Sequence, residues 1–572
     1  MATLTCYGAV DEIGGNKILL EDGERRALFD FGKAFGRYAD FFDGVFIKER
    51  VGRGLLDLLA LGLLPPLRGL LREDLIPGLD PTGLDVQTLE PTGRQRKARE
   101  RVTLQPQAVE SFWSHWQGSV PVPFRDLRRE NAPPVDLVLL SHAHQDHIGA
   151  LEYVAAEVPA ASTAITAFIS KVLIDAGMST SGAPFSAPRT PRPDGMLESQ
   201  RGAPLAARPW VFLDRPPAGT PGDDPLGDAA TFWAYAGTKT LVPQAGAVPS
   251  GMHVRHWPVD HSLFGAAGFA VETGAGWVAY SGDIRCHGSH GQATWDFAEA
   301  LGELRPTVLL CEGTRLTQTN TTTESTVLDR CLETVRGHAG RLVVADFAPR
   351  NVERLQTFHR IAQETKRRLL IQPRDAYLLR AMHLADPAAV PDLMADAHIG
   401  LYDDPKVSEY DWERLVRQRY EAETVSPQEV QRAPGQVLLA FSLTDAPDML
   451  DLAFLMGGRT EGVYLFSNSP AYDDEQRVDL IRLYHWTQHL GLELVGLAPV
   501  RDAEGTVVDL KPVSGYHASG HAGGDDLVEF VRRARPMTLV PIHTEAPERW
   551  AERLRGTGIS IVRPELGVPI QF

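Results

Sequence analysis

The 572-residue sequence has few cysteines, no uninterrupted long apolar run and no excess of positive charge. Its four cysteines, Cys6, Cys286, Cys311 and Cys331, lie far apart and form no Cys-x-x-Cys pair. This scattered usage argues against a disulfide framework. It predicts a protein of a reducing compartment, and we expect a cytoplasmic location.

The most apolar stretch, GLLDLLALGLLPPLRGLL at 54–71, is interrupted by Asp57 and by a proline pair. A membrane-spanning helix needs about 20 predominantly apolar residues, so this stretch cannot cross a bilayer. The N-terminal segment also lacks the apolar core of a secretory signal. We therefore expect no membrane association. The stretch itself predicts a pair of buried or interface helices, with a lid or a dimer surface as the alternative.

Negative charge predominates, with a net charge of −17 and a sequence isoelectric point near 5.5. This balance argues against nonspecific coating of nucleic acid, but it leaves room for a local basic channel because the shape of the field matters more than the total charge. Two basic segments, GRQRKARERV at 93–102 and FRDLRRE at 124–130, are candidate nucleic-acid contacts. The alternative is that both are ordinary solvated surface.

The order of apolar patterns predicts more than one structural unit in a chain of this length. Short strand patterns extend to about residue 32 and return at 135–314, on either side of a polar and helical insertion at about 33–134. From about 315 to 515, apolar strands alternate with amphipathic helices, which indicates a parallel α/β unit. Strand patterns of the first kind return at 516–572.

The segment VDLVLLSHAHQDHIGA places His142, His144, Asp146 and His147 directly after an apolar strand. Neutral imidazole nitrogens and carboxylate oxygens are the ligands that borderline divalent metals prefer. On a loop, His142 and His144 can converge on one ion, whereas Asp146 and His147 can turn toward a second. A lone histidine is more often structural, but three within six residues beside an aspartate predict a metal site.

This His-x-His-x-Asp-His pattern resembles the signature of the metallo-β-lactamase fold, and the later motifs resemble its β-CASP nuclease branch, above all ribonuclease J. The resemblance implies an α/β fold, namely an αββα sandwich with an inserted α/β β-CASP domain. It implies that the first part of the metallo-β-lactamase domain covers 1–314, the β-CASP domain covers 315–515, and the closing part covers 516–572. The insertion at about 33–134 has no counterpart in the family pattern.

The resemblance also implies metal ligands far from the first motif. His261 in PVDHS would bind the first ion, Asp283 in YSGDIR would bridge both ions, and His543 in VPIHTE would complete the second site. Asp30 in LFDFG would hold a ligand histidine by a hydrogen bond. Two divalent ions are expected, zinc first and manganese as the alternative. The predicted ligands are His142, His144, Asp146, His147, His261, Asp283 and His543.

Three residues carry the implied chemistry. His521 in HASGHAGG matches the β-CASP histidine that gives a proton to the leaving oxygen. Glu312 in LLCEGT matches the acidic residue that keeps this imidazole protonated. Asp146 counts as catalytic through its metal. Two ions about 3.5–4 Å apart favour in-line hydrolysis of a phosphodiester, so we expect a two-metal hydrolase.

The same HASGH segment resembles the ribonuclease J version of the motif. His517, Ser519 and Gly520 would then form a pocket for a terminal phosphate, whereas a plain glycine-containing turn is the alternative. In the cassette, LFSNSPAYDDEQ stands where ribonuclease J has a Gly-Ser-Gln-Gly-Glu-Pro-type segment. Ser467 and Ser469 are the candidates left there for phosphate contact.

We expect an RNA-processing ribonuclease that acts as a 5′–3′ exonuclease, as an endonuclease, or as both. One alternative is a DNA nuclease of the same branch, since discrimination depends on 2′-OH contacts that the sequence does not locate. Another is a non-catalytic β-CASP partner that only binds nucleic acid, and a third is a small-molecule ester hydrolase. Exonuclease polarity, the metal and a homodimeric state are left open.

Overall fold

The computed structural model describes residues 1–43, 46–65, 67, 69–75, 135–177, 184–191, 197–199, 204–237, 239–319, 322–348, 350–471 and 474–572. Most of the insertion expected at about 33–134 therefore lies outside the described residues. Both basic segments, 93–102 and 124–130, lie there as well.

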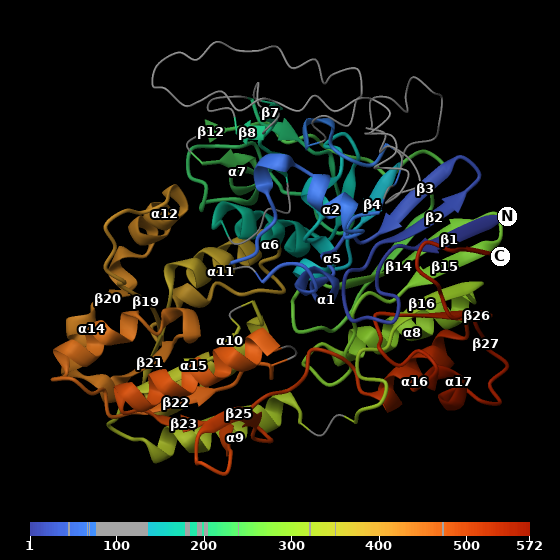
Figure 1. The fold of residues 1–572 in the computed structure, drawn as a ribbon. Coiled ribbons are helices and arrows are strands. Elements are labelled where there is room, and N and C mark those ends of the chain that lie inside the picture. The colour runs from blue at the N-terminus through green and yellow to red at the C-terminus, as the bar shows by residue number, and fades with distance from the viewer. Residues whose placement is uncertain are drawn as a thin grey trace, which may run out of the picture.

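Two sheets form the first lobe, which also contains both chain ends (Figure 1). The first has the order β10-β5-β4-β3-β2-β1-β28, with β1 (Ala2–Cys6), β2 (Ile18–Asp22), β3 (Arg25–Phe29), β4 (Leu137–Leu139), β5 (Ala160–Ser162), β10 (Trp210–Phe212) and β28 (Pro569–Gln571). The second has the order β13-β14-β15-β16-β26-β27, with β13 (Val254–Pro258), β14 (Ala267–Thr273), β15 (Gly276–Tyr280), β16 (Val308–Glu312), β26 (Thr538–Ile542) and β27 (Ser560–Ile561). The C-terminal strand β28 pairs with β1, so the closing segment completes both sheets.

Apolar side chains from both sheets form one core between them. Leu4 and Cys6 of β1 point to the same side because alternate residues of a strand share a face, and both are fully buried in this core. Phe29 of β3 meets Tyr280 of β15 across the interface, with ring centroids 5.1 Å apart. The two sheets therefore pack face to face as a sandwich.

Helices cover the outer faces of the sandwich. Phe168 of α6 (Ala164–Asp175) is buried in a cluster with Val138 and other outward residues of the first sheet. On the second sheet, α8 (Gly291–Leu304) and α16 (Gly524–Ala534) pack together over outward strand residues. The shorter helices of this lobe are α1 (Phe35–Ala39), α2 (Leu56–Ala60), α5 (Gln145–Ile148), α7 (Ala229–Ala234) and α17 (Arg549–Arg553).

The second lobe is built on a third sheet, in which every pair of strands is parallel. Its order is β20-β19-β18-β21-β17-β22-β23, with β17 (Val343–Asp346), β18 (Arg368–Ile371), β19 (Ile399–Tyr402), β20 (Thr424–Val425), β21 (Val437–Ala440), β22 (Val463–Phe466) and β23 (Glu493–Val495). Its helices are α9 (Glu324–Gly337), α10 (Val352–Thr365), α11 (Pro373–Ala385), α12 (Asp411–Arg419), α13 (Pro427–Arg432), α14 (Asp448–Leu455) and α15 (Asp474–Leu490).

These layers confirm the predicted fold class, a metallo-β-lactamase αββα sandwich with an inserted α/β domain. The seven strands of the third sheet lie within the predicted range 315–515. The limits 1–314, 315–515 and 516–572 themselves stay a prediction.

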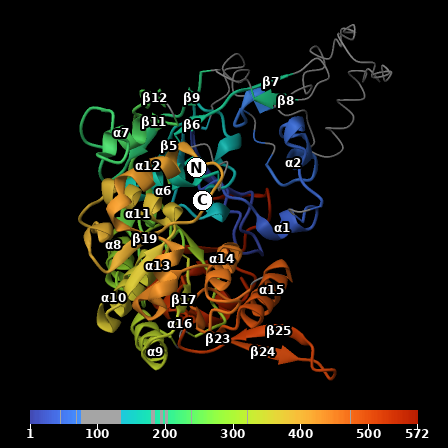
Figure 2. The ribbon, with the colours of Figure 1, turned by 90° about the vertical axis from the view of Figure 1, so that its left-hand side faces the viewer.

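The two lobes contact each other through α11 and α6, where Tyr377 donates a 2.7 Å hydrogen bond to Asp175. A hairpin of β24 (Leu497–Arg501) and β25 (Val507–Pro512) projects beside α15 (Figure 2). Three small two-stranded sheets complete the described strands: β6 (Phe185–Ser186) with β9 (Ala206–Ala207), β7 (Arg189–Pro191) with β8 (Leu197–Ser199), and β11 (Tyr235–Ala236) with β12 (Lys239–Thr240).

The apolar stretch at 54–71 is buried as expected, with Leu58, Leu59, Leu70 and Leu71 in the core next to α6. It does not form two helices in its described part, where only α2 is an α-helix. The helix ends at Ala60, ahead of the proline pair, because Gly62 just after its C-cap adopts a left-handed backbone conformation (φ 68°) that terminates helices. Among the described residues, no helix has the length and apolarity needed to span a membrane.

Candidate metal centre

Loops at one edge of the two facing sheets carry the candidate ligands. The neighbours β15, β16 and β26 are parallel, so their carboxyl ends meet at that edge. Strand β13 has the same direction as β15, because β14 lies between them and is antiparallel to both. The loop after β4 leads into α5 in the same way. The residues delivered are Asp30 after β3, His142 to His147 after β4, His261 after β13, Asp283 after β15, Glu312 at the end of β16 and His543 after β26.

The first group consists of His142, His144, His261 and Asp283, whose donor atoms lie within 4.8 Å of one another. His144 Nδ1 is 3.0 Å from His142 Nε2 and 3.1 Å from His261 Nε2. With metal–nitrogen bonds of about 2.0–2.1 Å, neighbouring ligands of a tetrahedral ion are about 3.3–3.4 Å apart. The three imidazole nitrogens are thus close to the spacing that a shared ion requires.

The second group consists of Asp146, His147, Asp283 and His543. Asp146 Oδ2 lies 3.7 Å from His147 Nε2 and 3.6 Å from His543 Nε2. Both of these ring nitrogens are buried and lack a hydrogen-bond partner of acceptable geometry. Buried polar atoms are normally satisfied, so this pair of orphaned nitrogens fits a bound metal ion.

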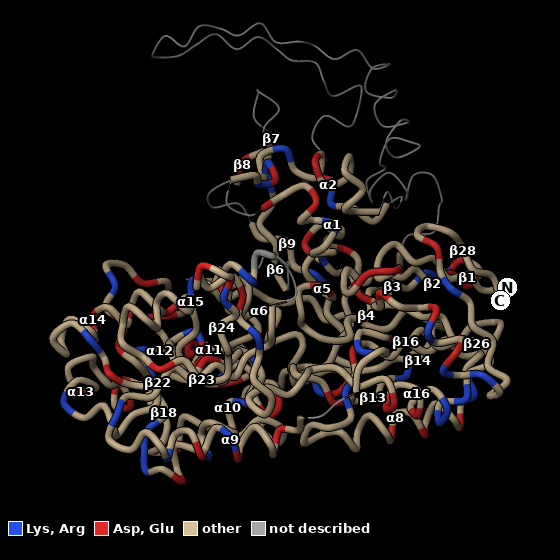
Figure 3. Tube along the Cα trace, turned by 60° about the horizontal axis from the view of Figure 1, so that its bottom comes forward, with Lys and Arg blue, Asp and Glu red and all other residues tan. Residues whose placement is uncertain are grey.

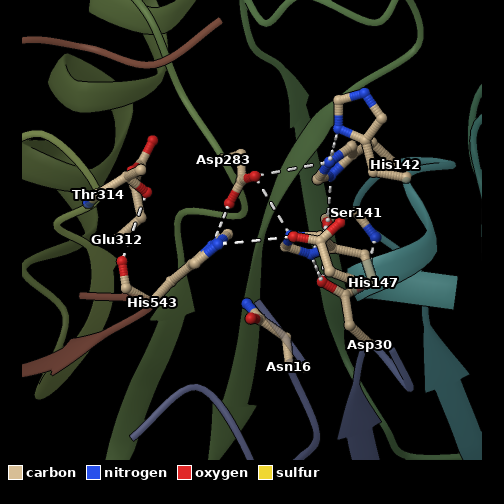
Figure 4. A network of polar contacts seen from close by, with 12 residues as sticks. Asn16, Asp30, Ser141, His142, His147, Asp283, Glu312, Thr314 and His543 are labelled. Atoms are coloured by element: carbon tan, nitrogen blue, oxygen red, sulfur yellow. Dashed lines mark hydrogen bonds and ion pairs between the residues drawn. The ribbon is translucent and has the colours of Figure 1, made fainter. Parts of the chain in front are cut away.

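Asp283 is the residue that the two groups share (Figure 4). Its Oδ2 lies 3.6 Å from His142 Nε2 and 3.2 Å from His147 Nε2, and its Oδ1 accepts a 2.7 Å hydrogen bond from His543 Nδ1. Burial would raise the pKa of this carboxyl, but the neighbouring imidazoles, His147 first, hold it well below its ordinary value. Asp283 is therefore an ionised carboxylate placed between the two groups.

The histidines of the first group are held neutral. Burial lowers the pKa of His142 and His261 well below the ordinary value, and repulsion from neighbouring imidazoles adds to it. Burial likewise lowers the pKa of His144 to about 4. Neutral imidazole is the form that binds metal, so these rings need lose no proton to do so near pH 7.

His147 behaves in the opposite way. Burial would lower its pKa, but Asp283, Asp146 and Asp30 together raise it well above the ordinary value. Three carboxylates around one buried ring make a place for positive charge, which a divalent cation can supply in place of the proton.

Asp30 fixes the orientation of His147. Asp30 Oδ2 accepts hydrogen bonds from His147 Nδ1 at 2.7 Å and from the Tyr280 hydroxyl at 2.5 Å, and the backbone and side chain of Ser141 donate to the same carboxylate. With Nδ1 occupied, Nε2 of His147 faces the other ligands. This is the contact that the family resemblance implies for Asp30.

The loop of Asp146 is held by close backbone packing. A Cβ on Gly32 would lie 1.6 Å from the Asp146 carbonyl oxygen, so this position requires glycine. The same carbonyl accepts a 3.0 Å hydrogen bond from the backbone N–H of Asn16. The loop that leads into β2 and the turn after β3 therefore set where Asp146 lies.

His521 and Glu312 form the contact expected from the sequence. Nδ1 of His521 lies 3.1 and 3.2 Å from the two carboxylate oxygens of Glu312, and its Nε2 lies 3.9 Å from Asp283 Oδ2. Burial would lower the pKa of His521, but Glu312 and then Asp283 raise it to about 9. The imidazole is therefore protonated near neutral pH, with Nε2 turned toward the candidate metal ligands.

The turn that carries the expected phosphate pocket is tied to the metal site. Gly520 O accepts a 2.7 Å hydrogen bond from His261 Nδ1, and Ser519 Oγ accepts one of 3.1 Å from the backbone N–H of His521. Burial lowers the pKa of His517 to about 3, and its buried Nδ1 has no hydrogen-bond partner. The three residues predicted to form the pocket thus lie in the turn that contacts the candidate ligand His261 and carries His521.

Ser467 and Ser469 are placed differently. Ser467 is buried, where its hydroxyl donates to the carbonyl of Tyr516 at 2.6 Å and accepts from Arg354 at 2.8 Å. Ser469 donates its backbone N–H to the side chain of Asn468. Neither contact points to phosphate binding.

Sequence reasoning missed His287. Its Nε2 lies 3.0 Å from the carbonyl oxygen of Ser519, so it supports the same turn. The only signal in the sequence is its position four residues after Asp283, and an isolated histidine there has no distinctive pattern.

Two family models match the chain. The model of the metallo-beta-lactamase superfamily matches residues 115–169, which include the HAHQDH segment. The model of the Zn-dependent metallo-hydrolase RNA specificity domain matches residues 508–564, which include His517, His521 and His543. No curated protein sequence matches the chain.

One solved structure, a protein of unknown function from Enterococcus faecalis V583, is similar over 100% of this chain and 99% of its own, with a TM-score of 0.60 and 18% identity. This likeness concerns the fold alone. The two family models and the clustered donors together support a divalent-metal-dependent hydrolase of the metallo-β-lactamase superfamily that carries an RNA-specificity domain.

Proposed function

We propose that this protein is a two-metal phosphodiesterase that cleaves RNA, with ribonuclease J-like activity. The observation that carries the proposal is the pair of four-residue ligand groups joined by Asp283. Side chains from four separate loops converge there, and the buried Nε2 atoms of His147 and His543 lack a hydrogen-bond partner of acceptable geometry. Two metal ions at one site are a recurring arrangement for in-line displacement at phosphorus.

In this proposal His142, His144 and His261 would hold one ion and Asp146, His147 and His543 would hold the other, with Asp283 available to both. Zinc is the expected metal, because imidazole-rich sites with a carboxylate suit it, and manganese is the alternative. When bound, such ions supply Lewis acidity and lower the pKa of water at the site. Asp146 is then catalytic through its place among these ligands.

His521 is the proposed general acid. Its protonated Nε2 faces the ligand groups, while Glu312 accepts from Nδ1 and stabilises the imidazolium. A proton transferred from Nε2 would neutralise the ribose oxygen that leaves as the phosphodiester breaks. Glu312 is held for this task by backbone N–H groups of Ile284 and Thr314, which donate to its two oxygens.

His517, Ser519 and Gly520 are proposed to receive the 5′-terminal phosphate. They share the turn with His521, and the hydrogen bond from His261 to Gly520 joins this turn to the metal ligands. A terminal phosphate held there would place a nearby phosphodiester at the metals. That arrangement favours 5′–3′ exonuclease action, with internal cleavage as the second mode.

RNA is the favoured substrate because the family model at 508–564 describes an RNA-specificity domain. A DNA nuclease is the second candidate, and a non-catalytic binding partner is disfavoured by the complete ligand set. In the described part of the chain, lysines and arginines are interspersed with acidic residues over both lobes (Figure 3). The four free cysteines, three of them buried, fit a cytoplasmic protein, and a homodimer is left open.

The test compares end-labelled oligonucleotides of RNA and DNA that carry a 5′-monophosphate, a 5′-hydroxyl or a 5′-triphosphate, with Zn²⁺ or Mn²⁺ added. The proposal predicts cleavage of RNA, fastest with the 5′-monophosphate, and release of mononucleotides from that end. Preference for DNA would support the second candidate. Absence of cleavage by protein with a full metal content would contradict the proposal.

A further inference from the structure

The N-terminal end of α10 is attached to the metal-ligand loops by buried ion pairs. Glu353 accepts hydrogen bonds from the Arg285 side chain and, at 2.7 Å, from the backbone N–H of Ser289. Arg354, the next residue, makes two hydrogen bonds to Glu324, of 2.9 and 3.0 Å. The start of this helix therefore docks against the first lobe.

The other side of this network reaches the ligands themselves. Arg285 lies two residues after Asp283, and its Nε donates a 3.0 Å hydrogen bond to Asp260, the residue before His261. Its backbone N–H also donates to the Asp260 carbonyl at 2.8 Å. The five charged residues, none more than 7% exposed, are Asp260, Arg285, Glu324, Glu353 and Arg354. Buried charges are tolerated only when well paired, so this network fixes α10 relative to both ligand loops.

Arg350 lies just before this attachment. The next residue, Asn351, caps α10 by accepting a 3.1 Å hydrogen bond from the backbone N–H of Arg354. Arg350 is therefore within about one helical turn of the docked residues, and its position follows from theirs. It comes from the inserted lobe, yet Asp146 opposes the lowering of its pKa, and its positive charge helps to lower the pKa of His144.

No partner satisfies this guanidinium within the described residues. Arg350 forms neither an ion pair nor a hydrogen bond there, whereas Arg285 and Arg354 in the same region form several each. Burial lowers its pKa and the attraction of Asp146 only partly opposes this. Arg350 is only half-buried, so a ligand can reach it. When cations bind the ligand groups, Asp146 is committed to them, and an anionic group of the substrate can then pair with the guanidinium.

We propose that Arg350 binds the scissile phosphate, and that the buried network at the start of α10 holds it over the metal site. This inference rests on the proposed function. A guanidinium offers parallel donors that match two phosphate oxygens, and its charge offsets the negative charge that develops there in the transition state. The inserted lobe would thus supply one of the groups that contact the reacting phosphate.

The test uses the metal-loaded full chain and two substrates, a 5′-monophosphorylated RNA and bis(p-nitrophenyl) phosphate. Arg350→Ala is expected to lower kcat/KM on both by about 10²–10³, the range for removing one donor to a developing oxyanion. Metal content and thermal unfolding stay at wild-type values. Arg350→Lys recovers part of the loss because an ammonium keeps the charge without the paired donors. Guanidinium ion in the buffer partly restores the alanine variant.

Arg360→Ala is the matched control. Arg360 lies on the same helix, its side chain is 63% exposed, and it pairs with Glu364 one turn away. Its replacement should leave both rates unchanged. Equal loss in this variant would mean that the effect comes from the helix as a whole and would overturn the assignment.

Binding separates this inference from the proposed function. Wild-type protein and Arg350→Ala are compared for binding of a phosphorothioate RNA, and about tenfold weaker binding is expected for the variant, as for loss of a charged hydrogen bond. If wild type cleaves RNA, and Arg350→Ala cleaves and binds it equally well, the role of Arg350 is refuted while the proposed function stands. If wild type cleaves no phosphodiester, the proposed function fails, and the binding comparison still decides whether Arg350 holds phosphate.

Discussion

Replacement of Glu312 by glutamine should shift the pH at which RNA cleavage declines. Glu312 is fully buried, and its carboxylate is the main charge that raises the pKa of His521 to about 9. Glutamine keeps the size of the side chain and removes the charge. Burial, which lowers the pKa of His521, then acts with less opposition.

The size of the effect follows from the two pKa values. At pH 8 an imidazole with the raised pKa of about 9 is about nine-tenths protonated. With the ordinary histidine pKa of about 6.5, taken for the variant, only about 3% is protonated, which is roughly 30-fold less. A general acid acts only while protonated, so the wild-type rate holds until the pH passes the raised pKa, and the variant declines at a lower pH. Bound cations repel the imidazolium in both proteins, so the separation of the two profiles is the quantity to measure.

The assay is the pH profile of kcat for RNA cleavage and, in parallel, for bis(p-nitrophenyl) phosphate. Glu312→Gln and His521→Ala should both slow RNA cleavage strongly, and His521→Ala by about 10²–10⁴. Both variants should slow hydrolysis of bis(p-nitrophenyl) phosphate only slightly, because p-nitrophenolate leaves without needing a proton. Unchanged metal content and thermal unfolding are the controls. Superimposable profiles for wild type and Glu312→Gln would refute the general-acid role.

Three further outcomes follow from the structure. His144→Ala should abolish hydrolysis while its circular dichroism spectrum stays native. Full activity in a protein that holds fewer than about one ion per chain would contradict this prediction. Burial raises the pKa of Asp346 to about 7, so its ionisation opposes folding increasingly as the pH rises from about 4 to 7. Asp346→Asn can still accept the hydrogen bond from Tyr464. In urea unfolding it should stabilise the protein by up to about 4 kcal/mol at pH 8 and have no such effect at pH 4. Arg354→Ala leaves Glu324 without two hydrogen bonds and should cost about 3–5 kcal/mol of unfolding free energy, and a wild-type midpoint would count against the buried network.

The candidate metal site was predictable from the sequence because each candidate ligand lies at the end of a strand pattern. His142, His261 and His543 are far apart in the chain, and only the family resemblance connected them before the structure brought their rings together. The contact of Glu312 with His521 spans 209 positions and followed from the same resemblance. The fold class was predictable for the same reason, since alternating strand and helix patterns fix the layers.

The network at the start of α10 was not predictable. Arg285, Glu353 and Arg354 are ordinary surface residue types, and their burial depends on how the inserted lobe docks on the first. Nothing in the spacing of Arg350 links it with Asp146, because the two come from different lobes. Ser467 shows the converse, since it was a candidate for phosphate contact but its hydroxyl is used inside this network.

The metal content of the purified chain tests the central claim most directly. Elemental analysis of wild type, Asp283→Asn and His543→Ala should give about two divalent ions per chain for wild type and a loss of metal and of RNA cleavage in both variants. Wild-type protein that cleaves RNA at full rate with less than one ion per chain, or variants that keep both ions and full activity, would contradict a shared two-ion site.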